Sequence, residues 1–166
     1  MATVRPAALA DAERIGEIHI RSWQEAYLGI LPEAFLASLS VEARVAFWRS
    51  DLAAMGEGDL ALVIENGSSV NGFARLATSA DRNHGEVQAI YLDPVHWRKG
   101  WGRTLMVAAE DSLSGLGWSE AILWVLEKNL PARRFYEALG WQSEPRRALL
   151  NIGGADVQEI RYHKVL

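Results

Sequence analysis

The densest group of chemistry-bearing residues lies where an apolar run is followed by a glycine-rich segment and then by a helical pattern. The segment reads Tyr91-Leu-Asp-Pro-Val-His-Trp-Arg-Lys-Gly-Trp-Gly-Arg-Thr-Leu-Met106. Such a loop exposes backbone N–H groups at the positive end of a helix dipole, and glycine lets an anion approach the backbone closely. Arg98, Lys99 and Arg103 add three cations within six residues. The segment therefore predicts an anion cradle suited to a pyrophosphate.

The two glycines of this segment, Gly100 and Gly102, are by themselves also compatible with a tight turn that binds nothing. A dinucleotide-binding fold is disfavoured because Leu105 follows where a third small residue is expected, and because Glu120 lies near the start of the next strand instead of its far end. The chain contains neither a P-loop pattern nor a Gly-x-Ser-x-Gly nucleophile elbow.

Hydrophobic periodicity and turn residues predict the elements that position this segment. Strands are expected at residues 2–5, 60–65, 70–78, 86–92, 121–126, about 141–152 and 157–165. Helices are expected from residue 11 to near Gly29, from Pro32, over 41–54, from the glycines at 100 and 102 to Gly115, and over 131–139. Ser40 should cap the third helix, and Asn66-Gly67 should form a type I′ hairpin turn with positive φ at both residues. The expected fold is α/β: one domain over residues 1–166, with a mixed sheet and helices on its faces.

Composition limits the class of protein. With 166 residues, 49% of them hydrophobic and 23% charged, the chain is typical of one globular domain. The absence of cysteine excludes disulfides, thiolate metal sites and a cysteine nucleophile, and it fits a cytoplasmic location. No run is long enough for a membrane span, and a formal charge of −4 argues against nucleic acid as a partner. No metal is expected, because no metal-binding spacing links the four histidines, His19, His84, His96 and His163.

A second informative segment is Glu127-Lys-Asn-Leu-Pro-Ala-Arg-Arg-Phe-Tyr-Glu-Ala-Leu-Gly-Trp141. Together with the cradle it resembles the GNAT superfamily of acyl-CoA-dependent N-acyltransferases. Members carry an Arg/Gln-x-x-Gly-x-Gly/Ala loop and an Asn-x-x-Ala-x-x-Phe-Tyr-x-x-x-Gly-Phe motif. The resemblance covers the whole chain in element order and is most specific from Glu86 to Trp141. It departs from the pattern at Trp97, where members have Arg or Gln.

The resemblance implies a GNAT-like, mostly antiparallel sheet and acetyl-CoA as co-substrate. Groups that bind coenzyme A are then implied at Ile90, Tyr91, Leu92, Arg98, Lys99, Gly100, Trp101, Gly102, Arg103 and Asn129. Backbone N–H groups of Ile90 and Leu92, on a strand splayed from its neighbour, are implied to polarise the thioester carbonyl. Because position 97 lacks the family's polar side chain, replacing Trp97 by alanine is expected to weaken coenzyme A binding less than changing the glycines.

Acyl transfer to an amine needs a base for the amine proton and an acid for the departing thiolate. The resemblance implies Tyr136 as the acid, whose usual pKa of about 10 is close to that of the thiol. Glu86 is the candidate base, with His84 and Glu137 as weaker candidates. A purely structural role is the open alternative for three of these residues. Glu86 fits a solvated surface charge, Asn129 fits a helix-start residue, and Tyr136 fits a core position with a buried hydrogen bond.

The predicted function is transfer of an acetyl group from acetyl-CoA to a primary amine of an unidentified acceptor, a small molecule or a peptide, in a ternary complex. Without cysteine, no acyl-enzyme can form through sulfur. Two alternatives are an acyl-CoA-binding sensor of the same fold and, less favoured, a nucleotide-binding regulatory domain. Trp23 and Tyr27, four residues apart on one helix face, could stack on the acceptor or belong to the core. Exposed edge strands near the C-terminus could pair two chains in a homodimer.

Overall fold

The chain forms one mixed sheet flanked by helices, and the computed structural model describes all 166 residues. The elements in chain order are β1 (Ala2–Pro6), α1 (Ala12–Ala26), α2 (Glu33–Ser38), α3 (Val41–Ala54), β2 (Leu60–Asn66), β3 (Ser69–Thr78), β4 (Gly85–Leu92), α4 (Trp101–Gly115), β5 (Glu120–Leu126), α5 (Leu130–Ala138), β6 (Gln142–Ile152) and β7 (Ala155–Val165). Short 3-10 turns cover Leu9–Asp11 and Pro94–His96. The mixed, mostly antiparallel sheet is confirmed. None of the helices combines the length and apolarity of a membrane span.

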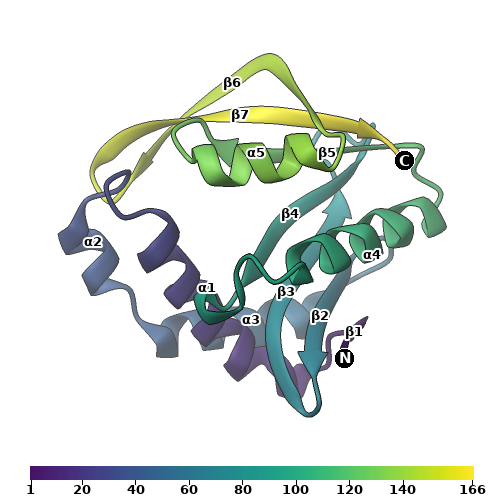
Figure 1. Cartoon of the computed structure of the whole chain (residues 1–166), viewed down its shortest axis with the longest axis horizontal. Helices are drawn as coiled ribbons and strands as arrows, with labels where there is room; N and C mark the ends of the chain where they lie inside the picture. Colours follow the sequence, from purple (N-terminus) through teal and green to yellow (C-terminus); the bar gives the residue numbers. More distant parts are fainter.

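The sheet parts in its middle, between β4 and β5. Its order is β1-β2-β3-β4-β5-β7-β6, and β4 and β5 are the parallel pair. Only Gly85 and Glu86 of β4 pair with β5, whereas pairing of β4 with β3 continues to Leu92. Figure 1 shows β4 running from this junction toward α1, away from β5 and β7. Most of β4 therefore has an open edge although the strand lies at the centre of the sheet.

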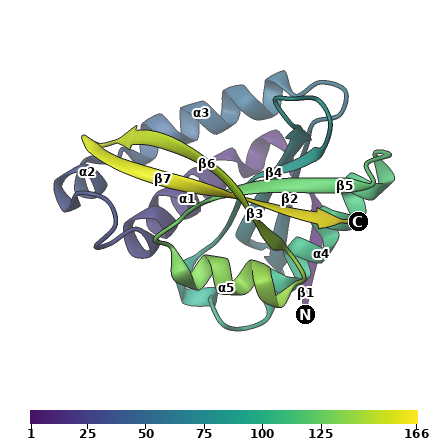
Figure 2. The ribbon, with the colours of Figure 1, turned by 90° about the horizontal axis from the view of Figure 1, so that it is seen from above.

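Helices cover both faces of the sheet, α1 and α3 on one and α4 and α5 on the other (Figure 2). Helical spacing gives α4 one fully buried apolar stripe against the sheet, made of Leu105, Met106, Ala109 and Leu113. On the opposite face, Ile15 and Ile18 of α1 pack with Trp48 of α3 and Phe73 of β3. Ser40 caps α3 as predicted, because its hydroxyl accepts a backbone N–H at 3.1 Å. These contacts hold the two sides of the parted sheet in place.

The hairpin between β2 and β3 forms, but its turn lies one residue later than predicted. Asn66 pairs with Ser69, so the central residues of the turn are Gly67 and Ser68. Gly67 has a φ of 64°, and Ser68 is not among the residues with positive φ. A type II′ turn requires positive φ at its first central residue alone. The predicted type I′ turn on Asn66-Gly67 is therefore wrong.

Helix α1 ends at Ala26, three residues before the predicted end near Gly29. The N–H of Leu31 donates to the carbonyl of Tyr27 at 2.9 Å and closes a turn there. Both side chains are buried in one apolar cluster beside β5 and β7. Packing against the sheet thus decides where the helix stops.

His19 is a buried imidazole between α1, α3 and β4. Its Nδ1 accepts a hydrogen bond from Trp48 Nε1 at 3.0 Å, and its ring stacks on Tyr91 with 4.9 Å between ring centroids. Burial, helped by the charge of Arg44, lowers the pKa of His19 to about 3. Protonation would place a charge in apolar packing, so this packing requires the neutral ring.

The depressed pKa of His19 predicts a pH-dependent stability. The unfolded chain takes up this proton near pH 6.5, whereas the folded chain takes it up only near pH 3. The stabilisation that neutral His19 gives to the folded state is therefore complete above pH 6.5 and is lost as the pH falls toward 3. In His19→Gln the amide can still accept from Trp48 but does not titrate. Between pH 7 and pH 5 the parent should therefore lose about 2 kcal/mol more unfolding free energy than the variant. Urea denaturation at both pH values measures this, and an equal loss in the two proteins would contradict it.

Candidate functional site

The open edge of β4 presents the backbone groups of alternate residues. The N–H of Asp93 donates to the carbonyl of Asn71 on β3 at 2.8 Å. This hydrogen bond identifies which alternate residues of β4 direct their backbone groups to β3. In an antiparallel pair, every second residue turns its N–H and C=O away from the partner strand. Ile90 and Leu92 therefore direct these groups to the open edge, whereas Tyr91 directs its own to β3. Any contact of Tyr91 with the cofactor, which the resemblance implies, would therefore have to come from its side chain.

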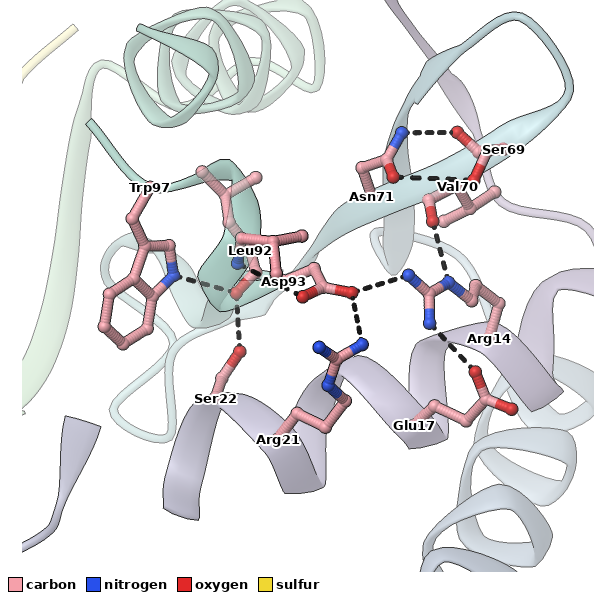
Figure 3. Close-up of polar contacts among 11 residues, drawn as sticks. Arg14, Glu17, Arg21, Ser22, Ser69, Val70, Asn71, Leu92, Asp93 and Trp97 are labelled. Carbon is pink, nitrogen blue, oxygen red and sulfur yellow. Dashed lines mark hydrogen bonds and ion pairs between the residues drawn. The ribbon is translucent and has the colours of Figure 1, made fainter. Parts of the chain in front are cut away.

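Two side-chain donors hold the carbonyl of Leu92 (Figure 3). Ser22 Oγ donates from α1 at 2.7 Å, and Trp97 Nε1 donates at 2.9 Å. A carbonyl oxygen has two lone pairs, and both are in use here. The indole of Trp97 thus fixes the end of β4, while the expectation that Trp97→Ala weakens coenzyme A binding less than the glycine changes stays a prediction. Leu92 is left with its N–H, but not its carbonyl, to offer to a ligand.

Asp93 anchors the same strand end to α1 (Figure 3). Its side chain is 1% exposed and accepts hydrogen bonds from Arg14 at 2.6 Å and from Arg21 at 2.8 Å. It also accepts the N–H of Val95 at 3.3 Å, which begins the 3-10 turn. A carboxylate this deeply buried requires such cationic partners. Sequence reasoning used Asp93 only as a strand stop, although two arginines seven residues apart on one helix face are a signal for a shared acidic partner.

The loop before α4 has the geometry of an anion cradle. Six consecutive backbone N–H groups, from Arg98 to Arg103, find no acceptor within the chain. Gly100 has a φ of 83° and Arg98 a φ of 60°, and these left-handed residues turn the loop into the first turn of α4. None of the ion pairs in the structure involves the side chains of Arg98, Lys99 or Arg103. The free amides, the helix dipole and the free cations together fit a pyrophosphate.

The cradle lies directly against α5 and the end of β4. A Cβ atom on Gly102 would lie 3.3 Å from Phe135 Cε2 and 3.5 Å from Leu92 Cδ1, so glycine permits the close approach. Asn129 caps α5, its Oδ1 accepting the N–H of Ala132 at 3.3 Å. The helix-start alternative for Asn129 therefore describes its oxygen correctly, while its Nδ2 donates to no group of the chain. The stacking of Trp101 on His96, with 4.5 Å between ring centroids, supports the other side of the loop.

Tyr136 follows Phe135 on α5 and is 8% exposed. Its ring contacts Tyr162, with 6.0 Å between centroids, but its hydroxyl forms no hydrogen bond within the chain. The alternative of a core tyrosine therefore holds for the ring, which belongs to the main buried cluster, but the buried hydrogen bond that it assumed is absent. Burial first, and the charge of Tyr91 second, raise the pKa of Tyr136 above its ordinary value. The hydroxyl thus remains protonated at neutral pH.

An aromatic cluster lies on the α1 side of β4. Tyr27 Oη and Tyr91 Oη are 3.3 Å apart, and the ring of Trp23 meets that of Tyr27 edge-on at 5.1 Å. Trp23 Nε1 is buried without a partner. After burial, the charge of Tyr91 is the next cause that raises the pKa of both Tyr27 and Tyr136. The core alternative holds for the ring of Tyr27, while stacking of Trp23 and Tyr27 on an acceptor stays a prediction.

Two unpaired carboxylates border the same region. Glu86 is half-buried where β4 and β5 part, and burial first, then the charges of Asp81 and Glu159, raise its pKa. A glutamate with a raised pKa is a better base at neutral pH than an exposed one. Glu159 on β7 is also half-buried, and burial raises its pKa too. Sequence reasoning missed Glu159, because nothing distinguishes it from the other polar residues of its strand.

The weaker base candidates, His84 and Glu137, both lie close to other polar side chains of the chain. His84 is 3.5 Å from Asp81 and 3.6 Å from Glu120. Glu137 is exposed on α5 and accepts the hydroxyl of Tyr162 at 2.7 Å. No three His, Asp or Glu side chains gather in a way that could hold a metal ion.

The shared carbonyl of Leu92 predicts non-additive stability effects. Trp97→Phe and Ser22→Ala each remove one donor and leave the other, so each should lower the unfolding free energy by about 0.5–1.5 kcal/mol. The double variant leaves the carbonyl without a side-chain partner and should lose more than the sum. Urea denaturation of the four proteins gives the coupling energy. An unchanged stability of Trp97→Phe would show that the indole N–H contributes nothing.

Comparison with known proteins agrees with this geometry. A family model described as "Acetyltransferase (GNAT) family" matches residues 13–141. YuaI of Bacillus subtilis, described as an uncharacterized N-acetyltransferase, is 35% identical over 83% of this chain and 79% of its own length. A spermidine N(1)-acetyltransferase of Thermoplasma acidophilum is 26% identical over 85% of this chain and 88% of its own length.

Solved structures show the same fold. The crystal structure of PaiA N-acetyltransferase from Thermoplasma acidophilum in complex with coenzyme A has a TM-score of 0.77 at 25% identity, covering 100% of this chain and 99% of that one. The structure of YncA from Salmonella typhimurium with its cofactor acetyl-CoA has a TM-score of 0.71 at 22% identity, covering 99% and 93%. The family match over residues 13–141 and the relative at 35% identity show that this chain belongs to the GNAT family and is an N-acetyltransferase.

Proposed function

We propose that the protein transfers an acetyl group from acetyl-CoA directly to a primary amine, with both substrates bound at the parted strands. The observation that carries this proposal is the continuous set of unpartnered groups along the split, from the amides of the cradle through the edge of β4 to the hydroxyl of Tyr136. No cysteine is present to carry the acyl group, so the amine attacks the thioester itself.

We assign the binding of coenzyme A mainly to backbone groups. The amides from Arg98 to Arg103, including those of Lys99, Gly100, Trp101 and Gly102, would hold the pyrophosphate, and the free cations would add charge. The N–H and C=O of Ile90 and the N–H of Leu92 would hold the pantetheine arm and polarise the thioester carbonyl. Asn129 Nδ2 is free to donate to the same arm.

Glu86 is proposed as the base for the incoming ammonium. Its raised pKa, which burial and two neighbouring carboxylates cause, brings its proton affinity closer to neutral pH. The ammonium loses its first proton to Glu86, directly or through water, and becomes the neutral amine. Its nitrogen then forms the new C–N bond as the C–S bond breaks, and it releases its second proton to water. The electron pair of the C–S bond leaves on the sulfur.

Tyr136 is proposed as the acid that protonates the departing thiolate. Its hydroxyl keeps its proton at neutral pH and has no competing acceptor in the chain. The buried surroundings that raise its pKa also disfavour an unprotonated thiolate, so transfer of the proton would relieve a charge in a site poor in water. The relative named as a spermidine acetyltransferase supports an amine acceptor, and a screen of amines for thiol release from acetyl-CoA would identify it.

Substitution of Gly102 tests the cradle. A valine at Gly102 would press on Phe135 and cover the amides, so coenzyme A affinity should fall by at least about tenfold. Gly115→Val at the other end of α4, where an added Cβ meets nothing within 4 Å, is the matched control. Calorimetry on the folded variants compares the affinities. Parent-like binding by Gly102→Val would show that coenzyme A lies elsewhere.

Tyr136→Phe tests the acid. Turnover at saturating substrates should fall by about 10²- to 10⁴-fold if chemistry limits the rate. The melting temperature and coenzyme A affinity should stay close to those of the parent, because the lost hydroxyl makes no hydrogen bond in the chain. Steady-state kinetics and thermal melts of this variant suffice, and an unchanged turnover number would remove Tyr136 from the mechanism.

A further inference from the structure

Glu86 and Glu159 differ from every other carboxylate that is buried or half-buried in this chain. All the others accept a hydrogen bond or pair with an arginine or lysine, as Asp93 does with Arg14 and Arg21. Glu86 and Glu159 do neither. Withdrawing an ionised carboxylate from water costs free energy unless a cation or a donor compensates it. The chain itself therefore supplies no compensating cation or donor to either carboxylate.

The two carboxylates lie on the strands that flank β5, β4 on one side of the split and β7 on the other. Glu86 lies on β4, at the last residue that pairs with β5. Glu159 lies on β7, on the same face as Val157, which packs against Tyr27. The charge of Glu159 raises the pKa of Glu86, Tyr27 and Tyr91, so it acts on groups from both α1 and β4. Glu159 thus borders the region where the aromatic hydroxyls gather.

Nearby cations are already bound to other groups. Arg161 lies two residues from Glu159 on the same strand face, but it pairs with Glu144 and also lies 3.7 Å from Asp81. The guanidinium of Arg44 lies over the ring of Trp23, 5.9 Å from its centroid. Neither makes an ion pair with Glu159. Both negative charges are consequently open to a ligand.

We infer that Glu159 binds a second ammonium group of the acceptor while the reacting nitrogen lies at Glu86. The acceptor class is then an alkyl amine with at least two cationic nitrogens, whose carbon chain contacts the rings of Tyr27 and Tyr91. This inference rests on the proposed function for the reacting nitrogen, but the binding of the second nitrogen does not require turnover. Glu159 is in this view a specificity-determining residue.

The test compares binding of 1,4-diaminobutane with that of butylamine to the coenzyme A-saturated protein by calorimetry. The parent should bind the diamine at least about tenfold more tightly, and Glu159→Gln should reduce this preference to about twofold or less. Glu13→Gln removes the same charge from an exposed residue at the far end of α1 and should keep the parent's preference. No preference in the parent, or the same preference in Glu159→Gln, would overturn the inference.

Stability and turnover give independent readouts. Because Glu159 has no partner in the chain, Glu159→Gln should melt at the parent's temperature or above it; a lower melting temperature would indicate a structural role and overturn the inference. Thiol release with monoamines would support the proposed function. If the protein showed no preference for the diamine at the same time, the inference about Glu159 alone would be overturned. A diamine preference that depends on Glu159, with no thiol release from any amine, would refute the proposed function alone.

Discussion

The loss of pairing between β4 and β5 after Glu86 is the constraint on which the rest of the structure depends. A central strand normally satisfies its backbone on both sides, but here one side of β4 is open for most of its length. An unpaired backbone group costs stability unless something else binds it. The chain places the cradle, Tyr136 and two unpaired carboxylates at this opening. The split is thus both an energetic liability and the place where substrates can complete the hydrogen bonding.

A strand with one free edge must be held in position by other contacts. The end of β4 is fixed by the two donors on the carbonyl of Leu92 and by Asp93, which draws Arg14 and Arg21 from α1. These bonds join the helix that lines the acceptor side to the strand and loop that line the cradle. A displacement of α1 would therefore move the free N–H of Leu92 and the loop together, because the network links the helix to the strand end.

Three polar groups near the split are buried without a partner that would stabilise their ionised forms. Burial raises the pKa values of Glu86, Glu159 and Tyr136 because no partner in the chain stabilises their ionised forms. His19 behind them stays neutral, since burial lowers its pKa. Such unsatisfied groups are costly in an empty site, and ligand contacts can offset that cost. The split thus carries unpaired negative charge at Glu86 and Glu159, and the loop before α4 carries cations that form no ion pair.

The sequence by itself determined the order of the elements, the cap of α3, the glycine-rich cradle and the position of Tyr136, because these depend on residues close together in the chain. Local rules failed where distant residues compete: α1 stops early because Tyr27 is drawn into the core, and the turn after Asn66 shifts with the register of its strands. Only the tertiary structure decided that Trp97 binds the carbonyl of Leu92 and that Glu86 and Glu159 have no partner on the strands that flank β5. The physical reason is that a side chain's pairing and pKa depend on which strands and helices surround it, and the parting of β4 from β5 sets those surroundings.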